Sequence, residues 1–365
     1  MVVNDFLTQS FNKNIVDGVV TWQSPSNIAL VKYWGKKQDQ IPANPSISFT
    51  LETSVTTTSL EYFKRGEEAI QTEFELYFEG KKKEDFKPKI EAFFKKIEAY
   101  CPYLKEFKFV IRTKNSFPHS SGIASSASGM SALALCIMSF EKALNPNLTP
   151  EYFNKKASFL ARLGSGSACR SIEGGLVVWG QHENIVGSSD LFGVQYPGEV
   201  HKVFQNYQDT ILLVDKGSKQ VSSSVGHNLM HGHPYAETRF QQAHSNLEDL
   251  RAILSSGDLK SFIEIVESEA LTLHAMMMSS RPYFILMKPN TLEIINKIWQ
   301  FREETGLPVC FTLDAGANVH VHYPEENKEE VFEFIKNELL AYCENEQYLC
   351  DRVGKGAIRL SDQNS

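Results

Sequence analysis

The sequence is poor in cysteine, and its cysteines do not stand in the pairs that bind zinc or form a redox dithiol. There are six cysteines in 365 residues, and no two of them have CxxC spacing. The chain is also too long and too poor in cysteine to be a small scaffold held together by disulfides. We therefore expect free, buried thiols in a protein of a reducing compartment.

Positive charge is also scarce. Lysine and arginine number 37 against 44 aspartates and glutamates, which gives a formal net charge of -7. A nucleic-acid-binding surface needs a field of basic residues, so we expect no nucleic-acid partner. Any anionic ligand must be met by a few cations gathered locally, and we look for these beside glycines.

Long apolar runs are missing as well. No run approaches the roughly 20 residues that a membrane-spanning helix needs. The first residues, MVVNDFLTQSFNKN, are polar and lack the apolar segment of a signal peptide. These features predict a cytoplasmic protein without a membrane partner.

The remaining composition is that of an ordinary globular protein, with 42% apolar and 22% charged residues. Since the chain is longer than one hydrophobic core usually supports, we expect two domains. Strands joined by short turns are mixed with helices, which predicts an α+β fold rather than a doubly wound parallel sheet. The predicted division is an N-terminal extension over 1–18, an N-terminal domain over 19–195 and a C-terminal domain over 196–365. The predicted strands are 19–22, 28–33, 47–51, 55–62, 74–78, 107–113, 175–179, 209–214, 309–313 and 319–323, and the predicted helices are 87–100, 125–144, 150–163, 235–254, 259–277, 290–306 and 325–343.

A loop rich in serine and glycine, from Ser120 to Ser128, follows a predicted strand and opens a predicted helix. Small residues let the backbone approach a ligand, and the N–H groups at a helix N-terminus attract phosphate. The loop has neither the GxxxxGK[ST] nor the GxGxxG pattern. The alternative interpretation is a serine-rich helix cap followed by a tightly packed helix.

Three further segments carry residue types that suit phosphate chemistry. NIALVKYWGKK, over 27–37, places Lys32 at the end of a strand and Lys36 beyond a glycine. GSGSACRS, over 164–171, offers Arg170, whose guanidinium can bind a carboxylate or phosphate through two hydrogen bonds. FTLDAGANVH ends a strand at Asp314, a candidate catalytic base. The alternatives are a solvated lysine run, a helix-to-strand turn and an aspartate that merely forms a turn.

Together these four segments resemble the galactokinase, homoserine kinase, mevalonate kinase and phosphomevalonate kinase superfamily. Within it they are most similar to the diphosphomevalonate decarboxylases, because all four occur in that family's order. The resemblance implies an N-terminal domain like domain 2 of ribosomal protein S5, with a left-handed β-α-β element. It also implies a ferredoxin-like C-terminal domain, a site between the two domains, and a homodimer.

The reaction implied by the resemblance uses ATP and Mg²⁺. ATP phosphorylates the 3-hydroxyl of mevalonate 5-diphosphate; loss of phosphate and carbon dioxide then yields isopentenyl diphosphate. The implied catalytic residues are Asp314 as base, Lys32 beside it, and Arg170 on the substrate carboxylate. The remaining implied residues bind substrate (Asn27, Tyr33, Lys36, Ser167 and Ser223) or the ATP phosphates (Ser120, Ser121, Gly122, Ala124, Ser125 and Ser126), with Ser126 the one candidate metal ligand.

The sequence departs from the family around the substrate phosphates. Ser120 and Ser121 replace apolar residues, Ala317 stands where proline is common, and Gly226-His227 replaces a Gly-Met pair. His231 and His233 have HxH spacing but no third ligand nearby, so we expect exposed loop histidines.

Three other functions remain open: a decarboxylase of mevalonate 5-phosphate or of a 3,5-bisphosphate, a mevalonate 3-kinase, and a catalytically silent binding protein. Retention of Asp314, Lys32 and Arg170 together favours decarboxylation.

Overall fold

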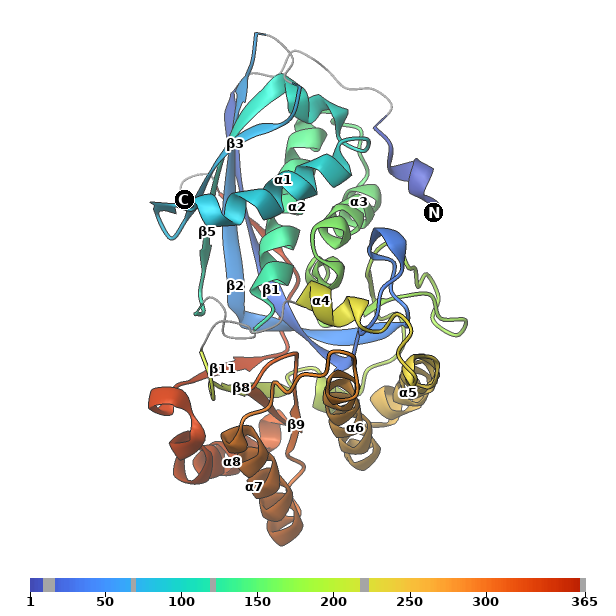
Figure 1. The fold of residues 1–365 in the computed structure, drawn as a ribbon, viewed down its shortest axis with the longest axis vertical. Coiled ribbons are helices and arrows are strands. Elements are labelled where there is room, and N and C mark those ends of the chain that lie inside the picture. The colour runs from blue at the N-terminus through green and yellow to red at the C-terminus, as the bar shows by residue number, and fades with distance from the viewer. Residues whose placement is uncertain (9–16, 67–69, 119–122, 217–222, 362–365) are drawn as a thin grey trace.

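The computed structural model describes residues 1–8, 17–66, 70–118, 123–216 and 223–361. The chain forms two lobes, each built on its own sheet with helices packed against it (Figure 1). This arrangement of strands and helices is the α+β architecture that the sequence predicts.

The N-terminal lobe is built on a strongly extended antiparallel sheet. Its strands run in the order β12-β1-β2-β5-β3-β4, and β6 and β7 continue from β2. Among the described strands, β3 and β5 are the parallel pair, and α1 connects them as a β-α-β unit. The strands are β1 (Gly18–Val31), β2 (Ser46–Lys64), β3 (Glu73–Phe78), β4 (Lys81–Lys82), β5 (Phe107–Asn115), β6 (Leu176–Trp179), β7 (Val194–Gln195) and β12 (Ile358–Leu360).

Two pairs of predicted short strands are in fact single long strands. The predicted strands 19–22 and 28–33 merge into β1, and 47–51 and 55–62 merge into β2. The polar residues read as a turn lie inside β1, where the register shifts between Pro25 and Asn27. Such an irregularity bends a strand without ending it, so polar letters alone are a poor sign of a turn here.

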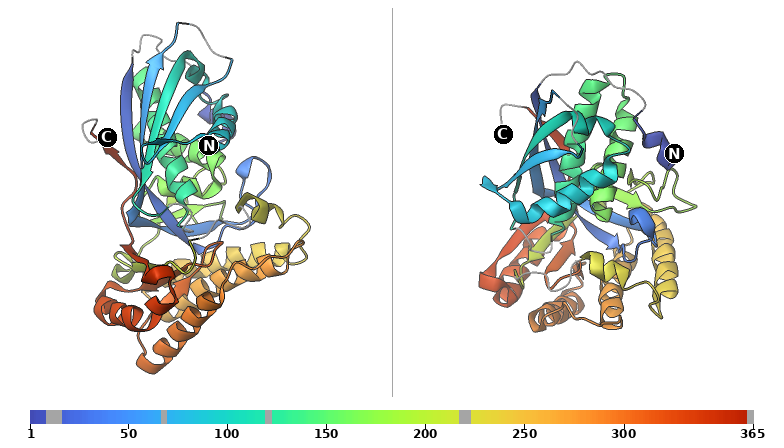
Figure 2. Two further views of the ribbon diagram at one scale, coloured as in Figure 1. Left: turned by 60° about the vertical axis from the view of Figure 1, so that its left-hand side comes forward. Right: turned by 45° about the horizontal axis from the view of Figure 1, so that its top comes forward.

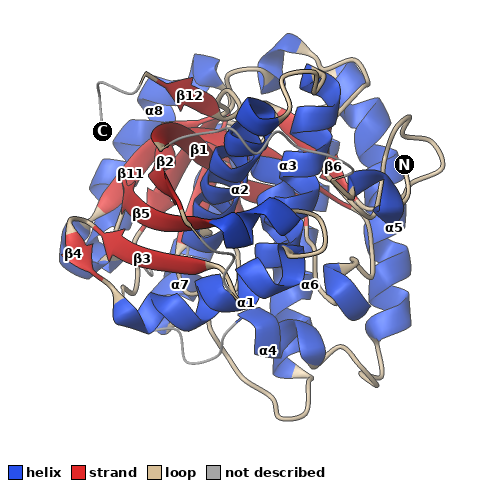
Figure 3. Ribbon diagram, turned by 90° about the horizontal axis from the view of Figure 1, so that it is seen from above, coloured by secondary structure: helices blue, strands red, loops and turns tan. Residues whose placement is uncertain are grey.

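Helices α1 (Lys87–Ile97), α2 (Ser125–Leu144) and α3 (Pro150–Gly164) cover one face of this sheet (Figures 1 and 3). Thr149 caps α3 by accepting a hydrogen bond from the backbone of Tyr152. Contrary to the expectation from sequence, α2 is long and apolar enough to cross a membrane by length and composition. However, 78% of the most apolar stretch of α2 is buried inside the protein, as in a helix of a hydrophobic core.

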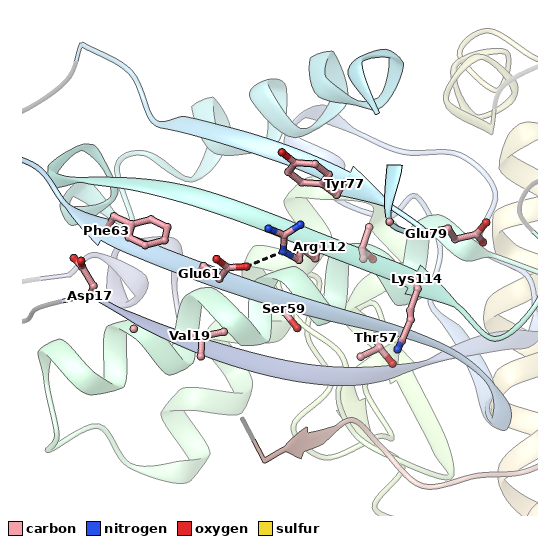
Figure 4. Close-up of a pocket in the computed structure, with 13 residues that line it drawn as sticks. Asp17, Val19, Thr57, Ser59, Glu61, Phe63, Tyr77, Glu79, Arg112 and Lys114 are labelled. Atoms are coloured by element: carbon pink, nitrogen blue, oxygen red, sulfur yellow. Dashed lines mark hydrogen bonds and ion pairs between the residues drawn. The ribbon is translucent and has the colours of Figure 1, made fainter. Parts of the chain in front are cut away.

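The opposite face of the sheet carries polar side chains around a cavity of about 650 Å³ (Figure 4). Thr57 and Ser59 of β2 point to this face, and Arg112 of β5 pairs with Glu61 of β2 at 2.8 Å. This cavity therefore lies on the face of the sheet that helices α1, α2 and α3 do not cover.

The C-terminal lobe contains a four-stranded antiparallel sheet in the order β11-β8-β10-β9. The predicted hairpin between 309–313 and 319–323 is confirmed, since His320 pairs with Thr312. The predicted helix 325–343 is broken into α8, a π-helical turn over 335–339 and a 3₁₀ turn. The elements of this lobe are β8 (Gln208–Leu212), β9 (Cys310–Thr312), β10 (Val319–Tyr323), β11 (Tyr348–Arg352), α4 (Ser223–Asn228), α5 (Ala236–Ser256), α6 (Leu259–Met278), α7 (Pro289–Thr305) and α8 (Lys328–Phe334).

Both ends of the chain depart from the predicted domain limits. Phe6, in the predicted extension, is fully buried and stacks on Phe159 of α3 with ring centroids 4.3 Å apart. At the other end, β12 leaves the C-terminal lobe and pairs with β1 of the upper sheet (Figure 2). The two lobes also share a core, in which Phe49 of β2 packs near Tyr207 and Phe262.

Candidate active site

Lys32 and Asp314 form an ion pair where the two lobes meet. Lys32 comes directly after β1, and Asp314 lies two residues beyond β9. The Lys32 Nζ atom lies 3.2 Å from Asp314 Oδ1. Lys32 is 1% exposed, whereas the Asp314 side chain is 31% exposed. The Asp314 carboxylate is therefore accessible to a ligand, whereas the Lys32 ammonium is buried.

Burial sets the electrostatics of this pair. Desolvation lowers the pKa of Lys32, and the charge and hydrogen bond of Asp314 oppose that effect. A positive charge at this distance stabilises the ionised form of Asp314. The pair thus presents a carboxylate able to accept a proton, next to a cation able to stabilise developing negative charge.

A second buried ion pair holds the backbone of Lys32 in place. The Lys32 N–H donates to Glu269 Oε2 of α6 at 2.8 Å. Glu269 is in turn paired with Arg239 of α5 through both guanidinium NH groups, one of them at 2.8 Å from Oε1. Sequence analysis missed both residues. The signal was available for Glu269, because it stands on the apolar stripe of α6 between Val266 and Leu273, where a charge needs a partner.

Arg170 is a buried guanidinium surrounded by neutral groups. It lies in the 3₁₀ segment Gly166–Ser171 and is 2% exposed. It donates to the hydroxyls of Ser48 and Ser46, the latter at 2.7 Å, and to Asn27 Oδ1 at 3.4 Å. Among the described residues no carboxylate forms an ion pair with it, and burial lowers its pKa. Because a buried charge is costly without a counter-charge, this arrangement suits an anionic ligand.

The predicted substrate residues Tyr33 and Lys36 lie beyond Lys32 along the chain. The Tyr33 ring lies between Trp179 and His227, with centroids 4.6 Å and 4.2 Å away. Gly35 has a φ of +99°, and its N–H donates to His227 Nδ1 at 3.0 Å. This turn carries Lys36 to a cavity of about 900 Å³. The cavity is lined by further cations, among them Lys37, Lys96 and Arg162.

The departure from the family at Gly226-His227 has a packing explanation. His227 is buried against Tyr33 and Trp34, and burial lowers its pKa to about 3, so the ring is neutral. A side chain on Gly226 would approach the Trp34 ring to 2.5 Å. His227 therefore fixes the turn that presents Lys36, a role that sequence analysis did not assign.

Asn27, one of the predicted substrate residues, contacts Arg170 and hydrogen-bonds to the backbone of Ser167. Asn27 Nδ2 donates to Ser171 Oγ at 2.7 Å and to the Ser167 carbonyl at 3.2 Å. Ser223 begins α4, and its side chain is outside the described part of the chain.

The predicted phosphate loop is described only in its second half. Ser120, Ser121 and Gly122 lie outside the described residues. Ala124 adopts a left-handed conformation with φ of 40°, and α2 begins at Ser125. Ser126 Oγ lies 3.3 Å from Ser165 Oγ.

A cavity of about 200 Å³ adjoins the start of α2. It is lined by Ser125 and Ser126 together with apolar side chains that include Phe78, Met130 and Leu133. A lining that combines hydroxyl and apolar side chains suits a ligand with a charged and a flat apolar part.

One of the two histidines of the HxH segment differs from the prediction that both are exposed. His231 is exposed, but His233 is buried. The His233 ring accepts a hydrogen bond from the Tyr235 N–H at 3.1 Å, and its other nitrogen lies 3.2 Å from Ser279 Oγ. His233 therefore has a structural role at the start of α5.

Comparison with known proteins agrees with this geometry. Residues 24–191 match the diphosphomevalonate decarboxylase-like N-terminal domain, and residues 210–363 match the mevalonate 5-diphosphate decarboxylase C-terminal domain. Diphosphomevalonate decarboxylase of Saccharomyces cerevisiae is 30% identical over 86% of this chain and 79% of its own length. The mevalonate diphosphate decarboxylase from Enterococcus faecalis is 27% identical, with a TM-score of 0.79 over 95% of this chain and 100% of its own. A solved complex, MDDEF with MVAPP, AMPPCP and magnesium, is likewise 27% identical, with a TM-score of 0.80 over 95% of this chain and 100% of its own. The two family domains, matched in order over most of the chain, show that the protein belongs to the diphosphomevalonate decarboxylase family.

Proposed function

We propose that this chain catalyses the ATP-dependent decarboxylation of mevalonate 5-diphosphate to isopentenyl diphosphate, a step of isoprenoid biosynthesis. The observation that carries the proposal is the meeting of Lys32, Asp314 and Arg170 at the junction of the lobes. A kinase needs the first two residues. An additional buried guanidinium whose partners among the described residues are all neutral suits an enzyme whose substrate also carries a carboxylate.

Asp314 begins the reaction. Its carboxylate accepts the proton of the tertiary 3-hydroxyl as the oxygen attacks the terminal phosphorus of ATP, which releases ADP. Lys32 stabilises the negative charge on the transferred phosphoryl group and keeps Asp314 ionised before the proton moves. The 3.2 Å separation of the two side chains supports both roles.

Arg170 acts in the second half of the reaction. Its guanidinium holds the substrate carboxylate and orients the C–C bond for cleavage. As carbon dioxide leaves, the bonding electrons form the new double bond and the 3-phosphate departs. Ser46, Ser48 and Asn27 fix the guanidinium plane, so orientation costs little at the moment of reaction.

The substrate diphosphate has its own group of residues. Lys36 contributes charge, and Tyr33 contributes a hydroxyl that burial keeps protonated by raising its pKa. Asn27, Ser167 and Ser223 complete this group in the proposal. The lysines and arginine around the cavity beside Lys36 attract an anionic substrate to it.

ATP binds at the start of α2 in this proposal. Ser120, Ser121, Gly122, Ala124, Ser125 and Ser126 hold its phosphates, supported by the helix N-terminus and by the cavity at Ser125 and Ser126. Mg²⁺ accompanies the nucleotide and offsets its charge, with Ser126 as the candidate ligand from the chain. A complex of a related protein with AMPPCP and magnesium supports the binding of a nucleotide with magnesium.

We also propose that the protein works in the cytoplasm as a homodimer, without a nucleic-acid or membrane partner. The net charge of -7 and the burial of α2 support the absence of such partners. Sedimentation equilibrium of the purified chain tests the oligomeric state.

The central experiment is a substrate panel with ATP and Mg²⁺. Mevalonate, its 5-phosphate and its 5-diphosphate are offered separately, and ADP and carbon dioxide are measured independently. Equal amounts of both products from the diphosphate alone are expected. ADP without carbon dioxide would identify a kinase, and activity on the monophosphate would move the substrate assignment.

The Asp314→Asn variant tests the base. It is expected to bind ATP normally and to lose turnover with the 5-diphosphate by several orders of magnitude, because an amide cannot accept the hydroxyl proton. Near-normal turnover would remove Asp314 from the mechanism.

A further inference from the structure

A second group of ionisable side chains is buried in the C-terminal sheet. Asp209 of β8 pairs directly with His322 of β10, and His320 lies two residues before His322. Residues two apart on a strand point to the same face, so all three side chains share one surface of the sheet. Each is 2% exposed or less.

The three residues place their potential ligand atoms close together. One nitrogen or oxygen atom from each lies within 4.8 Å of the others. His320 Nδ1 is 2.8 Å from Asp209 Oδ2, and His322 Nε2 is 3.6 Å from Asp209 Oδ1. Two ligands of a tetrahedral zinc ion are about 3.4 Å apart when each bond measures about 2.0–2.1 Å. The spacing at His322 therefore suits a shared cation better than a hydrogen bond.

Polar atoms without partners gather at the same place. Among the described residues, nine buried side-chain atoms lack a hydrogen-bond partner, and four of them belong to Asp209, His322 and Thr312. Both ring nitrogens of His322 are in this group. Thr312 pairs with His320 across β9 and β10, so its hydroxyl faces the same patch. A buried polar atom without a partner costs about 1–3 kcal/mol, and a concentration of them indicates a ligand that satisfies several at once.

We propose that Asp209, His320 and His322 bind a structural divalent transition-metal ion, with zinc as the expected occupant. Imidazole and carboxylate form a donor set that zinc accepts, and the complete burial of the three side chains is typical of a structural rather than a catalytic centre. The ion links β8, which carries Asp209, to β10, which carries the two histidines. Because β10 pairs with β9, which leads to Asp314, it stabilises the sheet that presents the catalytic base. It is distinct from the magnesium that accompanies ATP.

A second histidine group shows why burial and orientation matter. His182, Glu183 and His244 also bring ligand atoms together, near the surface between β6 and α5. There, however, the Asn184 N–H donates to His182 Nδ1 at 3.3 Å. A neutral histidine that accepts at Nδ1 carries its proton on Nε2, so neither nitrogen of that ring offers a lone pair to a metal. Neither nitrogen of His322 is committed in this way.

Metal analysis of the purified chain tests the proposal. The protein is expressed without a histidine tag in medium containing zinc, and bound metals are measured by inductively coupled plasma mass spectrometry. The native chain is expected to hold zinc in stoichiometric amount, and His322→Phe and Asp209→Asn to lose it. His244→Ala, from the other histidine group, is the matched control and should retain it.

His322→Phe separates metal binding from simple packing. The ring of His322 has Phe49 and Tyr207 as aromatic neighbours, at 6.3 Å and 6.2 Å, so phenylalanine fits this environment. If His322 were only a core side chain with unpaired nitrogens, phenylalanine would leave the melting temperature unchanged or raise it. The proposal predicts a lower melting temperature together with loss of zinc.

A measurement on the native chain covers the case in which the variants do not fold. The chain is unfolded with a chelator present, and it is refolded with and without zinc. A higher melting temperature with zinc is expected. A native chain without metal, equal melting temperatures after refolding, or zinc that follows His244 rather than His322 would each overturn the proposal.

Discussion

Lys32 and Arg170 are cations that the fold buries and surrounds with fixed hydrogen-bonding groups. The two differ in how their charge is balanced: Lys32 faces Asp314, whereas the described residues give Arg170 only serine and asparagine oxygens. A buried cation whose partners are all neutral lowers stability unless a ligand completes it. At the scale of single residues, the surroundings of Arg170 therefore favour the binding of an anion.

Arg170→Lys tests this preference. Lysine keeps the charge but cannot hold a carboxylate in two-point fashion. We expect turnover to fall by about 10²-fold or more. The substrate carboxylate would be held less accurately, and a misplacement of about 1 Å at a reacting group can cost about that much. Steady-state kinetics with carbon dioxide release as the readout measures it. Arg352→Lys, at an exposed pair with Glu52, is the control and should retain normal turnover. Equal activities in both variants would show that Arg170 has no special role.

Buried histidines predict how stability depends on pH. Burial lowers the pKa of His227 to about 3 and that of His274 to about 4, from an ordinary 6.5. At pH values between the lowered pKa of each folded ring and the ordinary pKa of 6.5, the unfolded chain therefore binds more protons than the folded chain. Stability from both rings is fully present above pH 6.5 and is lost as the pH falls below it. Each ring accounts for a loss of about 1 kcal/mol between pH 7.5 and 5.5.

Urea unfolding at pH 5.5, 6.5 and 7.5 measures this loss. In His227→Asn the dependence should become shallower, because the amide oxygen can still accept from Gly35 but does not titrate in this range. His231→Asn, at an exposed ring, should leave it as in the native chain. A dependence that is equally steep in His227→Asn would contradict the assignment.

At the scale of elements, α5 and α6 do more than cover the C-terminal sheet. Through Arg239 and Glu269 they hold the peptide group of Lys32, which belongs to the other lobe. Arg239 donates to the Lys32 carbonyl at 3.3 Å, and Asn44 donates to the same atom at 3.0 Å. The position of the catalytic ammonium therefore depends on helices more than 200 residues away in sequence.

Glu269→Gln should destabilise the protein strongly. It leaves Arg239 buried without a counter-charge, and breaking such a pair typically costs about 3–5 kcal/mol. Chemical unfolding measures the free energy. The double variant Glu269→Gln with Arg239→Met should recover stability but not turnover, because the Lys32 backbone loses its anchor. Recovery of both would mean that the pair has no part in positioning Lys32.

At the scale of the whole molecule, the two lobes are not independent. They share a hydrophobic core, and the end of the chain returns to the upper sheet. The returning segment is hydrogen-bonded to the N-terminal lobe at several points, for example from Gly354 N to Thr50 O at 2.8 Å and from Ala357 N to Ile172 O at 3.0 Å. The packing is tight enough that a side chain on Gly174 would lie 2.2 Å from Gly356 N. We infer that the chain unfolds as one unit.

A chain ending at Val353 tests this inference. It lacks β12 and the bonds of the returning segment, so we expect the melting temperature to fall by about 5 °C or more. Hydrogen exchange should accelerate in β1 at 21–23, the residues that pair with β12. Calorimetry of the full chain should show a single transition. Unchanged exchange in β1 would show that the returning segment contributes little.

Local patterns in the sequence determined most helices, the hairpin that ends at Asp314, and the residue types of the site. These features depend on neighbours within a few positions, such as the periodicity of α3 and the glycines around Arg170. Four motifs in a recognisable order then placed Lys32, Arg170 and Asp314 in one site, and the geometry brings Lys32 and Asp314 together as expected.

Only the tertiary structure decided which contacts form between distant parts of the chain. The continuity of β1 and β2, the return of β12, the Glu269–Arg239 anchor and the Asp209–His320–His322 group all depend on contacts between residues far apart in sequence. Two of them, the Glu269–Arg239 anchor and the Asp209–His320–His322 group, put charged or polar groups in the interior, where sequence patterns predict apolar ones. Their stability comes from a partner supplied by the fold, and no local pattern reveals that partner.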